Sequence, residues 1–284
     1  MLKQRILTAL LLLAVLLPAT FHPSPYPFVV VTLVLLSAGA WEWACLNAMG
    51  ATAALAAAGV CAALCVLAWY LGIASQALGF VWMGVGCFWV LGSAWVLRGG
   101  AMAWQKFHPN GRLAVGVLLL WLAWIAIVQA RTMGINFLLS VLALVWAADI
   151  GAYFAGRGLG GKFFANKLAP TISPGKTWEG VCGGGMAVLL LALLWMYADA
   201  HWLVDSPSIY SRLLAMGHLP LLVGLAFLLA MSVVGDLVES LFKRSAGVKD
   251  SSHLLPGHGG VLDRVDALLP VLPLALMLVS VASV

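Results

Sequence analysis

The sequence has little charge: 9% of its 284 residues are charged, whereas 63% are hydrophobic. Soluble domains usually carry about 25% charged residues. A soluble fold of this composition would lack the polar side chains needed to cover its surface, whereas a bilayer removes that need. The scarcity of charge therefore argues against a soluble domain and predicts an all-α, polytopic integral membrane protein in contact with membrane lipids.

Paired cysteines are also lacking, because the sequence contains no C-x-x-C pair. The cysteines all lie in or beside apolar stretches, where a free thiol behaves as a small apolar side chain. We interpret them as buried packing residues rather than as disulfide partners or metal ligands. They are Cys45, Cys61, Cys65, Cys87 and Cys182.

Long apolar stretches dominate the chain, and a spanning helix needs roughly 20 apolar residues. The first stretch is short and follows a basic N-terminus, so it is a signal anchor or, as the alternative, a cleaved signal peptide. We predict about nine transmembrane helices, near residues 5–19, 28–47, 52–72, 77–97, 113–130, 134–155, 180–198, 219–241 and 267–283.

The basic residues test this count, because cytoplasmic loops are enriched in lysine and arginine. With the N-terminus in the cytoplasm and nine alternating spans, all 15 basic residues except Arg131 and Arg212 fall in cytoplasmic segments. The C-terminus would then lie outside. Topology accounts for the net charge of +5, so no nucleic acid partner is needed.

Acidic residues are nearly missing from the first half. Residues 1–130 contain only Glu42, which we interpret as a packing or interfacial residue rather than a catalyst. The remaining acidic residues lie between 149 and 266. We therefore predict a scaffold region, 1–130, that faces lipid or a second subunit, and a catalytic region, 131–284, with its site on the cytoplasmic side.

Ionisable residues inside predicted spans are costly and hence functional candidates. Asp149 lies in the sixth span and Asp236 in the eighth. Asp236, Glu239, Ser240 and Lys243 are spaced i, i+3, i+4 and i+7, so they share one helical face. This face is either a polar stripe between packed helices or the wall of a charged, aqueous site.

The following segment adds cations and carboxylates side by side. It contains Lys243-Arg244, Lys249-Asp250, the run Pro256 to Gly260, and Asp263-Arg264-Val265-Asp266. Paired glycines allow backbone N–H groups to approach an anion closely. Lysine and arginine offset phosphate charge, and aspartate oxygens suit Mg²⁺. The combination indicates phosphoryl or nucleotidyl transfer, which depends on positioning and charge neutralisation.

A third cluster covers residues 156–180. Gly156 to Lys162 imitates a P-loop, but Phe163 replaces the Ser or Thr that would bind Mg²⁺, and a predicted membrane helix precedes it instead of a strand. We expect either a basic, glycine-rich loop that contacts phosphates or an ordinary cytoplasmic loop. Ser173, Lys176 and Thr177 either bind an anion at the start of the seventh span or cap that helix.

The stretch from Ser240 to Asp266 resembles the signature of the phosphatidate cytidylyltransferases, also called CDP-diacylglycerol synthases. The family pattern reads S-x-hydrophobic-K-R, four residues, K-D, and later H-G-G-hydrophobic-x-D-R-hydrophobic-D, and each fixed position is met here. The upstream Ser173-Pro-Gly-Lys-Thr-Trp-Glu-Gly180 is similar to this family too. The resemblance covers residues 149–266 and nothing specific in the first four spans.

The resemblance implies that CTP and phosphatidic acid react to give CDP-diacylglycerol and pyrophosphate with Mg²⁺, and that the protein is a homodimer. The membrane is either a bacterial inner membrane or an organelle membrane, and a short chain without soluble extensions favours the bacterial one. A second, monovalent cation stays open. The metal ligands would be Asp236, Asp263 and Asp149. The catalytic residues would be Asp236, Asp263, Lys249, Arg264, Lys243, Arg244, Asp250 and Asp266. Substrate would be bound by Ser173, Lys176, Thr177, Ser240, His258, Gly259 and Gly260.

Three other classes fit less well. A transporter with Asp149 and Asp236 as coupling sites would show broken helices at matched positions of a repeat, and no such pair is found. A CDP-alcohol phosphotransferase would show D-x-x-D-G-x-x-A-R, which is lacking. A purely structural membrane protein leaves the charged cluster unexplained.

Overall fold

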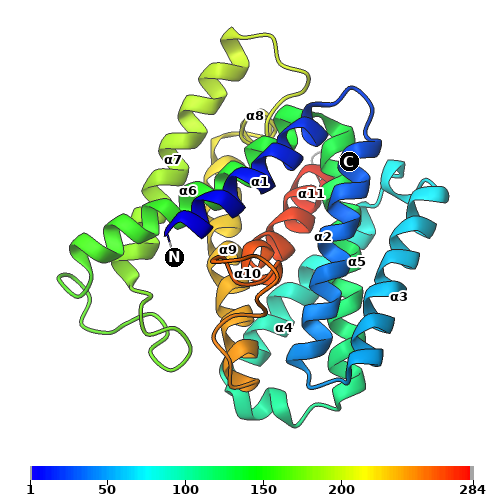
Figure 1. Cartoon of the computed structure of the whole chain (residues 1–284). Helices are drawn as coiled ribbons and strands as arrows, with labels where there is room; N and C mark the ends of the chain where they lie inside the picture. The colour runs from blue at the N-terminus through cyan, green and yellow to red at the C-terminus, as the bar shows by residue number, and fades with distance from the viewer. Residues whose placement is uncertain (1, 282–284) are drawn as a thin grey trace.

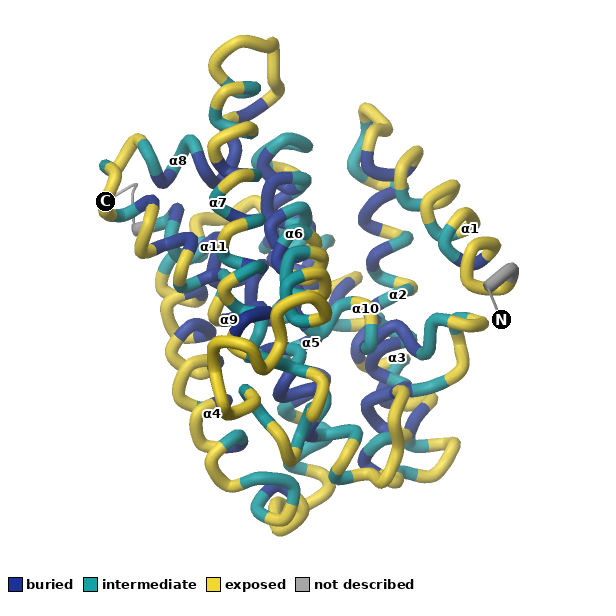
Figure 2. The backbone as a smooth tube through the Cα atoms, turned by 90° about the vertical axis from the view of Figure 1, so that its left-hand side faces the viewer, coloured by how far each residue is buried: buried dark blue, intermediate teal, exposed yellow. Residues whose placement is uncertain are grey.

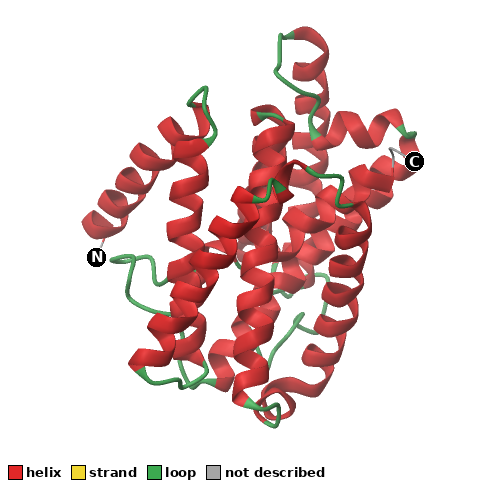
Figure 3. Cartoon of the chain, turned by 90° about the vertical axis from the view of Figure 1, so that its right-hand side faces the viewer, coloured by secondary structure: helices red, strands yellow, loops and turns green. Residues whose placement is uncertain are grey.

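The computed structural model describes residues 2–281, and within them it is helical without a strand, as predicted (Figure 3). The long helices are α1 (Leu2–Phe21), α2 (Tyr26–Leu46), α3 (Ala51–Tyr70), α4 (Gly79–Gln105), α5 (Pro109–Met133), α6 (Ile135–Leu159), α7 (Trp178–His201) and α9 (His218–Ser245). The shorter ones are the 3₁₀ helix η1 (Ile73–Ser75), α8 (Ile209–Ala215), α10 (Leu262–Val265) and α11 (Leu268–Val281).

Eight of these helices are long and apolar enough to cross a bilayer, and they coincide with the first eight predicted spans. The ninth predicted span corresponds to α11, which has 14 described residues; positions 282 and 283 of that prediction lie outside the described residues. Val271 and Leu274 of α11 are fully buried, and the helix packs on α4, α5 and α9. The number nine is therefore not confirmed.

The bundle is organised around α9 and α11, which contact α4, while α2 and α3 pack outside α5 (Figure 1). Buried residues gather on the inward faces, and the outward faces and most of α1 are exposed (Figure 2). Exposed positions include large apolar side chains such as Phe80 and Leu91. Such a surface is stable where lipid covers it, because lipid tails do not require polar groups.

Small residues bring α6 and α7 into backbone contact, the most extensive helix pairing in the described chain. A Cβ atom at Gly183 would lie 2.2 Å from the Cβ of Ala155, and one at Gly151 would lie 2.6 Å from the carbonyl oxygen of Gly183. Glycine lets the two backbones approach in this way. The crossing places the start of α7 beside the end of α6 that carries Asp149.

The connections predicted to be cytoplasmic lie at one end of the bundle. These are the segments after α2, α4, α6 and α9, and they occupy the lower part of Figure 1. The segments after α1, α3 and α7 lie at the other end. The basic loops are thus gathered on one side, as the alternation of spans predicts.

Candidate active site

The polar face of α9 forms the centre of the charged region. The hydroxyl of Ser240 donates a hydrogen bond to Oδ1 of Asp236 over 3.2 Å. Lys243 forms ion pairs with Glu239, one turn earlier, and with Asp263, where Nζ and Oδ1 are 2.5 Å apart. Asp236 pairs with Lys176, with 2.6 Å between Nζ and Oδ2. The predicted face therefore exists, and ion pairs join it to α10 and to the loop before α7.

Asp263 is held by donors on both of its oxygens. Besides Lys243, it accepts 2.8 Å hydrogen bonds from the backbone N–H and the hydroxyl of Ser251 and from the N–H of Gly260. Burial opposes ionisation, but the hydrogen bonds from Lys243, Gly260 and Ser251 outweigh it and lower the pKa of Asp263 to about 2. The carboxylate is therefore ionised and holds together the signature loop, which we define as residues 246–261.

Asp266 lies one turn further along. Burial, together with the nearby carboxylate of Asp236, raises the pKa of Asp266 to about 7, and the charge of Asp149 adds to this shift. The backbone N–H of Ala267, 2.8 Å from Oδ1, works in the opposite direction. Asp149, Asp236 and Asp266 are thus close enough to repel one another, a charge arrangement that a cation would relieve.

A polar cavity of about 320 Å³ lies between α6, α7 and α9. Asp149, Tyr153, Lys176, Thr177 and Asp236 contribute to its wall. It therefore collects a carboxylate from each of two helices and the ammonium group of the loop that precedes α7. This is the space into which a phosphate group could enter from the basic end of the bundle.

The three predicted metal ligands are not all brought together. Asp149 and Asp236 share the polar cavity, whereas Asp263 lies in α10, bound to the signature loop, and does not line the cavity. Within residues 2–281, no three side chains of histidine, cysteine, aspartate or glutamate converge closely enough to hold a metal ion. The chemistry of the donors does suit Mg²⁺, because carboxylate oxygens are hard ligands and the carboxylates of Asp149, Asp236 and Asp266 repel one another.

Glu42 of α2 is the residue that sequence reasoning undervalued. Its side chain is fully buried, and it accepts 2.8 Å hydrogen bonds from the backbone N–H groups of Val261 and Leu262. The hydroxyls of Ser252 and Ser251 donate to it over 2.6 and 3.2 Å. Glu42 is thus buried, as a packing residue would be, and the segment that it contacts is the signature loop. The sequence did contain a signal for this role. Glu42 is the one acidic residue in residues 1–130, and it lies in an apolar predicted span.

Two adjacent glycines of the signature loop, Gly259 and Gly260, have a close-packing role. Gly259 has a φ of +81°, and a Cβ there would lie 2.7 Å from Oδ2 of Asp263. At Gly260 a Cβ would lie 2.0 Å from the hydroxyl of Ser251 and 2.4 Å from Oε1 of Glu42. The N–H of Gly260 points at Asp263, so the protein's own carboxylate takes the place that the sequence pattern suggested for a bound phosphate.

The other predicted residues lie around this centre. Thr177 caps α7, since its hydroxyl accepts from the N–H of Gly180 over 3.1 Å. Ser173 closes a turn of the same loop by donating its N–H to Ala169. The carbonyl oxygen of His258 accepts two hydrogen bonds from the exposed Arg264, of 3.1 and 2.8 Å. Arg244, Lys249 and Asp250 are exposed at the outer edge.

Glu179, which sequence reasoning did not select, organises the loop before α7. It is buried in the first turn of the helix, and its Oε1 accepts from the N–H groups of Phe163 and Phe164 over 3.1 Å each. The segment that imitates a P-loop is thereby folded back onto α7. The helix dipole favours a carboxylate at a helix N-terminus. The position of Glu179 at the start of a predicted span was therefore the sequence signal for this role.

Comparison with known proteins tests the resemblance that the signature suggested. Residues 3–282 match the model of the cytidylyltransferase family. The phosphatidate cytidylyltransferase of Pseudomonas aeruginosa is 39% identical over 96% of this chain and 95% of its own length. That of Haemophilus influenzae is 36% identical over 96% of both chains, and that of Bacillus subtilis 39% identical over 53% of this chain and 49% of its own. These matches confirm the resemblance inferred from the signature, and the chain belongs to the cytidylyltransferase family.

Proposed function

We propose that this chain makes CDP-diacylglycerol and pyrophosphate from CTP and phosphatidic acid. The two relatives that match nearly the whole chain carry the name of that enzyme. The observation that carries the proposal is the network in which Lys176 pairs with Asp236 and Lys243 pairs with Asp263, at one end of a membrane bundle. Cations for phosphates and carboxylates for a metal ion are needed together in nucleotidyl transfer.

The reaction would be a direct in-line displacement. A phosphate oxygen of phosphatidate forms a bond to the α-phosphorus of CTP, the bond from that phosphorus to the bridging oxygen breaks, and pyrophosphate leaves with the electron pair. The attacking oxygen is already ionised, so no general base is required. Lys176, Lys243 and Arg264 would orient both substrates and offset their negative charge.

Mg²⁺ would be held by Asp236 with Asp149, and by Asp263 or Asp266 as the further ligand. When bound, the ion would offset the charge that develops on the pyrophosphate group. The low pKa of Asp263 keeps that carboxylate ionised at neutral pH, which suits a ligand, although one of its present donors would have to yield.

The location follows from the substrates. CTP is cytosolic and phosphatidate is a membrane lipid, so we propose that the end of the bundle with the basic loops faces the cytoplasm of a bacterial inner membrane. A homodimer is a further expectation that comes from the family resemblance.

The test is incorporation of radiolabelled CTP into lipid by the purified protein in detergent. With phosphatidic acid and Mg²⁺ we expect labelled CDP-diacylglycerol and an equal amount of pyrophosphate, and we expect EDTA to stop both. Absence of product from well-folded protein across several lipids and metals would contradict the proposal. Product formation in EDTA would contradict the metal assignment alone.

A further inference from the structure

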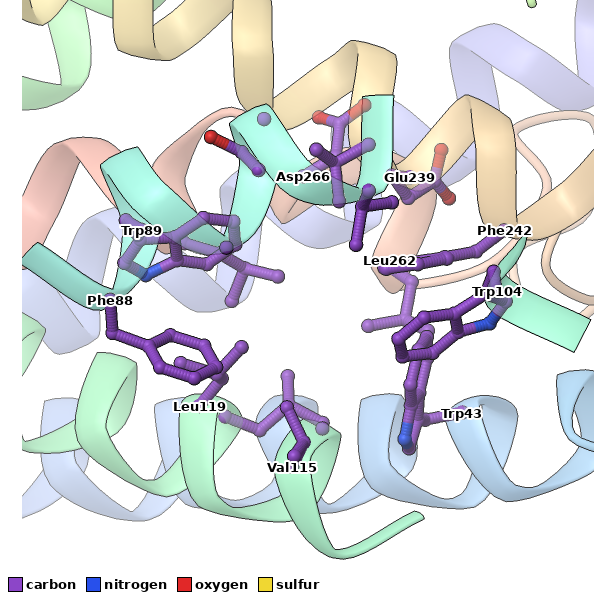
Figure 4. A pocket seen from close by; sticks show the side chains of 18 of the residues that line it. Trp43, Phe88, Trp89, Trp104, Val115, Leu119, Glu239, Phe242, Leu262 and Asp266 are labelled. Carbon is purple, nitrogen blue, oxygen red and sulfur yellow. The ribbon is translucent and has the colours of Figure 1, made fainter. Parts of the chain in front are cut away.

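A second cavity lies in the middle of the spanning helices, between α2, α4, α5, α9 and α11, and has a volume of about 290 Å³ (Figure 4). Its wall is mainly aromatic and apolar, with Phe88 and Trp89 on one side and Trp43, Trp104 and Phe242 on the other. The ring centroids of Phe242 and Trp104 are 4.4 Å apart, and those of Phe242 and Trp43 are 5.0 Å apart. Such a lining disfavours a nucleotide, because apolar side chains cannot replace the water molecules that solvate its phosphates.

The aromatic side is closely packed around Trp43. The indole N–H of Trp43 donates to the carbonyl oxygen of Arg112 over 2.9 Å. A Cβ atom at Gly116 would lie 2.0 Å from that indole nitrogen, so Trp43 fits against the bare backbone of α5. The cavity is therefore a preformed space between packed helices rather than a loose gap.

One wall of this aromatic cavity carries two carboxylates, Glu239 and Asp266 (Figure 4). Glu239 is the ion-pair partner of Lys243. Along α9, Gly235 and Glu239 border the aromatic cavity, whereas Asp236 borders the polar cavity. The aromatic cavity thus lies against the same charged face that we assign to the reaction.

The part of the wall that α4 forms reaches the outer surface of the bundle. Phe88 and Trp95 of α4 both line the cavity and are about half exposed, at 47% and 52%. Gly92 lies one turn from each of them and also borders the cavity. Because α4 is a candidate membrane span, this rim faces lipid, so a hydrocarbon chain has direct access.

We infer that the aromatic cavity binds part of one acyl chain of the phosphatidate substrate while its phosphate lies at the charged face of α9. The inference rests on the proposed function. A volume of about 290 Å³ is at the small end of the roughly 300–1,000 Å³ of ligand pockets, so the cavity takes a segment of a single chain. A chain that leaves lipid for this cavity gains packing contacts and a defined position rather than hydrophobic free energy.

Two glycines of α4 provide a matched pair of variants. A Cβ at Gly92 would meet only the ring of Phe88, at 3.8 Å or more, and one at Gly84 would meet nothing within 4 Å. Gly92→Leu should therefore fill the aromatic cavity without disturbing the backbone, and Gly84→Leu should place the same side chain in lipid. Gly92→Ala is a smaller step in the same direction.

The first measurement is the KM for dioleoyl phosphatidate, expressed as mole fraction in mixed micelles. Gly92→Leu should raise this KM roughly three- to tenfold, because one segment of the acyl chain loses its packing contacts. Gly92→Ala should raise the KM less, and Gly84→Leu should leave it unchanged. The KM for CTP should stay the same in all three, which also shows that the variants are folded.

The second measurement is labelling by phosphatidate with a diazirine on its acyl chain, followed by mapping of the modified peptides. We expect label in the Phe88–Val96 segment of the wild type, competition by unlabelled phosphatidate, and loss in Gly92→Leu. Unchanged KM and labelling in Gly92→Leu would overturn the inference, as would equal labelling by diazirine phosphatidylcholine that phosphatidate does not displace. If the wild type makes no CDP-diacylglycerol, the proposed function itself fails.

Discussion

Among single side chains, Asp263 accepts four hydrogen bonds that join α9 and the signature loop to α10. Asp263→Asn should reduce turnover at least about 100-fold, because one oxygen becomes an NH₂ group that faces the Lys243 ammonium or the N–H groups of Ser251 and Gly260. The measurement is labelled CDP-diacylglycerol formation by protein that elutes as a monodisperse species.

The matched control is Asp205→Asn. Asp205 accepts hydrogen bonds from the N–H groups of Ile135 and Asn136, at the other end of the bundle. That variant should keep its turnover. Near-normal activity of Asp263→Asn would mean that neither metal binding nor organisation of the loop depends on this carboxylate.

A second prediction for a single side chain concerns Glu42. Glu42→Gln should leave N–H and O–H donors of the signature loop without acceptors, at a cost of about 1–3 kcal/mol in stability. The loop should then open more often, so trypsin should cleave faster after the exposed Lys249, and kcat should fall while the chain stays inserted. Unchanged proteolysis and unchanged kcat would show that the loop does not depend on Glu42.

For whole helices, the decisive contact is the crossing of α6 and α7. Gly183→Ala places a methyl group 2.2 Å from the Cβ of Ala155, so the helices must separate, at roughly 1–3 kcal/mol. We expect a lower melting temperature in detergent and lower turnover, since the cavity that contains Asp149 and Lys176 would widen. Gly158→Ala, on the open side of α6, should change neither. Equal melting temperatures for the two variants would contradict the role of the crossing.

The ninth predicted span, α11, shows what local sequence signals do not determine. Hydropathy identifies α11 as apolar, and so does its composition, but the structure describes 14 residues packed among α4, α5 and α9. A helix that is apolar all round is buried either in lipid or in protein. Only its neighbours distinguish the two, so the count of spans could not be decided from hydropathy.

For the molecule in its membrane, the orientation is testable with single cysteines in a cysteine-free background. Lys106→Cys lies in the connection after α4, and Leu203→Cys lies in the connection after α7. On intact spheroplasts, a membrane-impermeant maleimide should label position 203 and should reach position 106 only after the membrane is opened. The reverse pattern would place the N-terminus outside.

The division of the chain into a scaffold, 1–130, and a catalytic region, 131–284, stays a prediction. The structure shows that the two parts share the site region, since Glu42 holds the signature loop. α1 contacts it as well, through the hydroxyl of Thr8 and the carbonyl oxygen of Pro256, 2.8 Å apart. A truncated second half would therefore lose the support of its own signature loop.

The sequence by itself determined the all-helical membrane class, the first eight spans, the polar face of α9 and the family, because apolar length, helical spacing and a short motif are local properties of the chain. The tertiary structure decided which groups meet. Glu42 contacts residues more than 200 positions away, Asp263 takes its donors from α9 and the signature loop, and the two cavities lie on either side of α9. These outcomes depend on how helices pack, and packing is set by side chains that are distant in the chain.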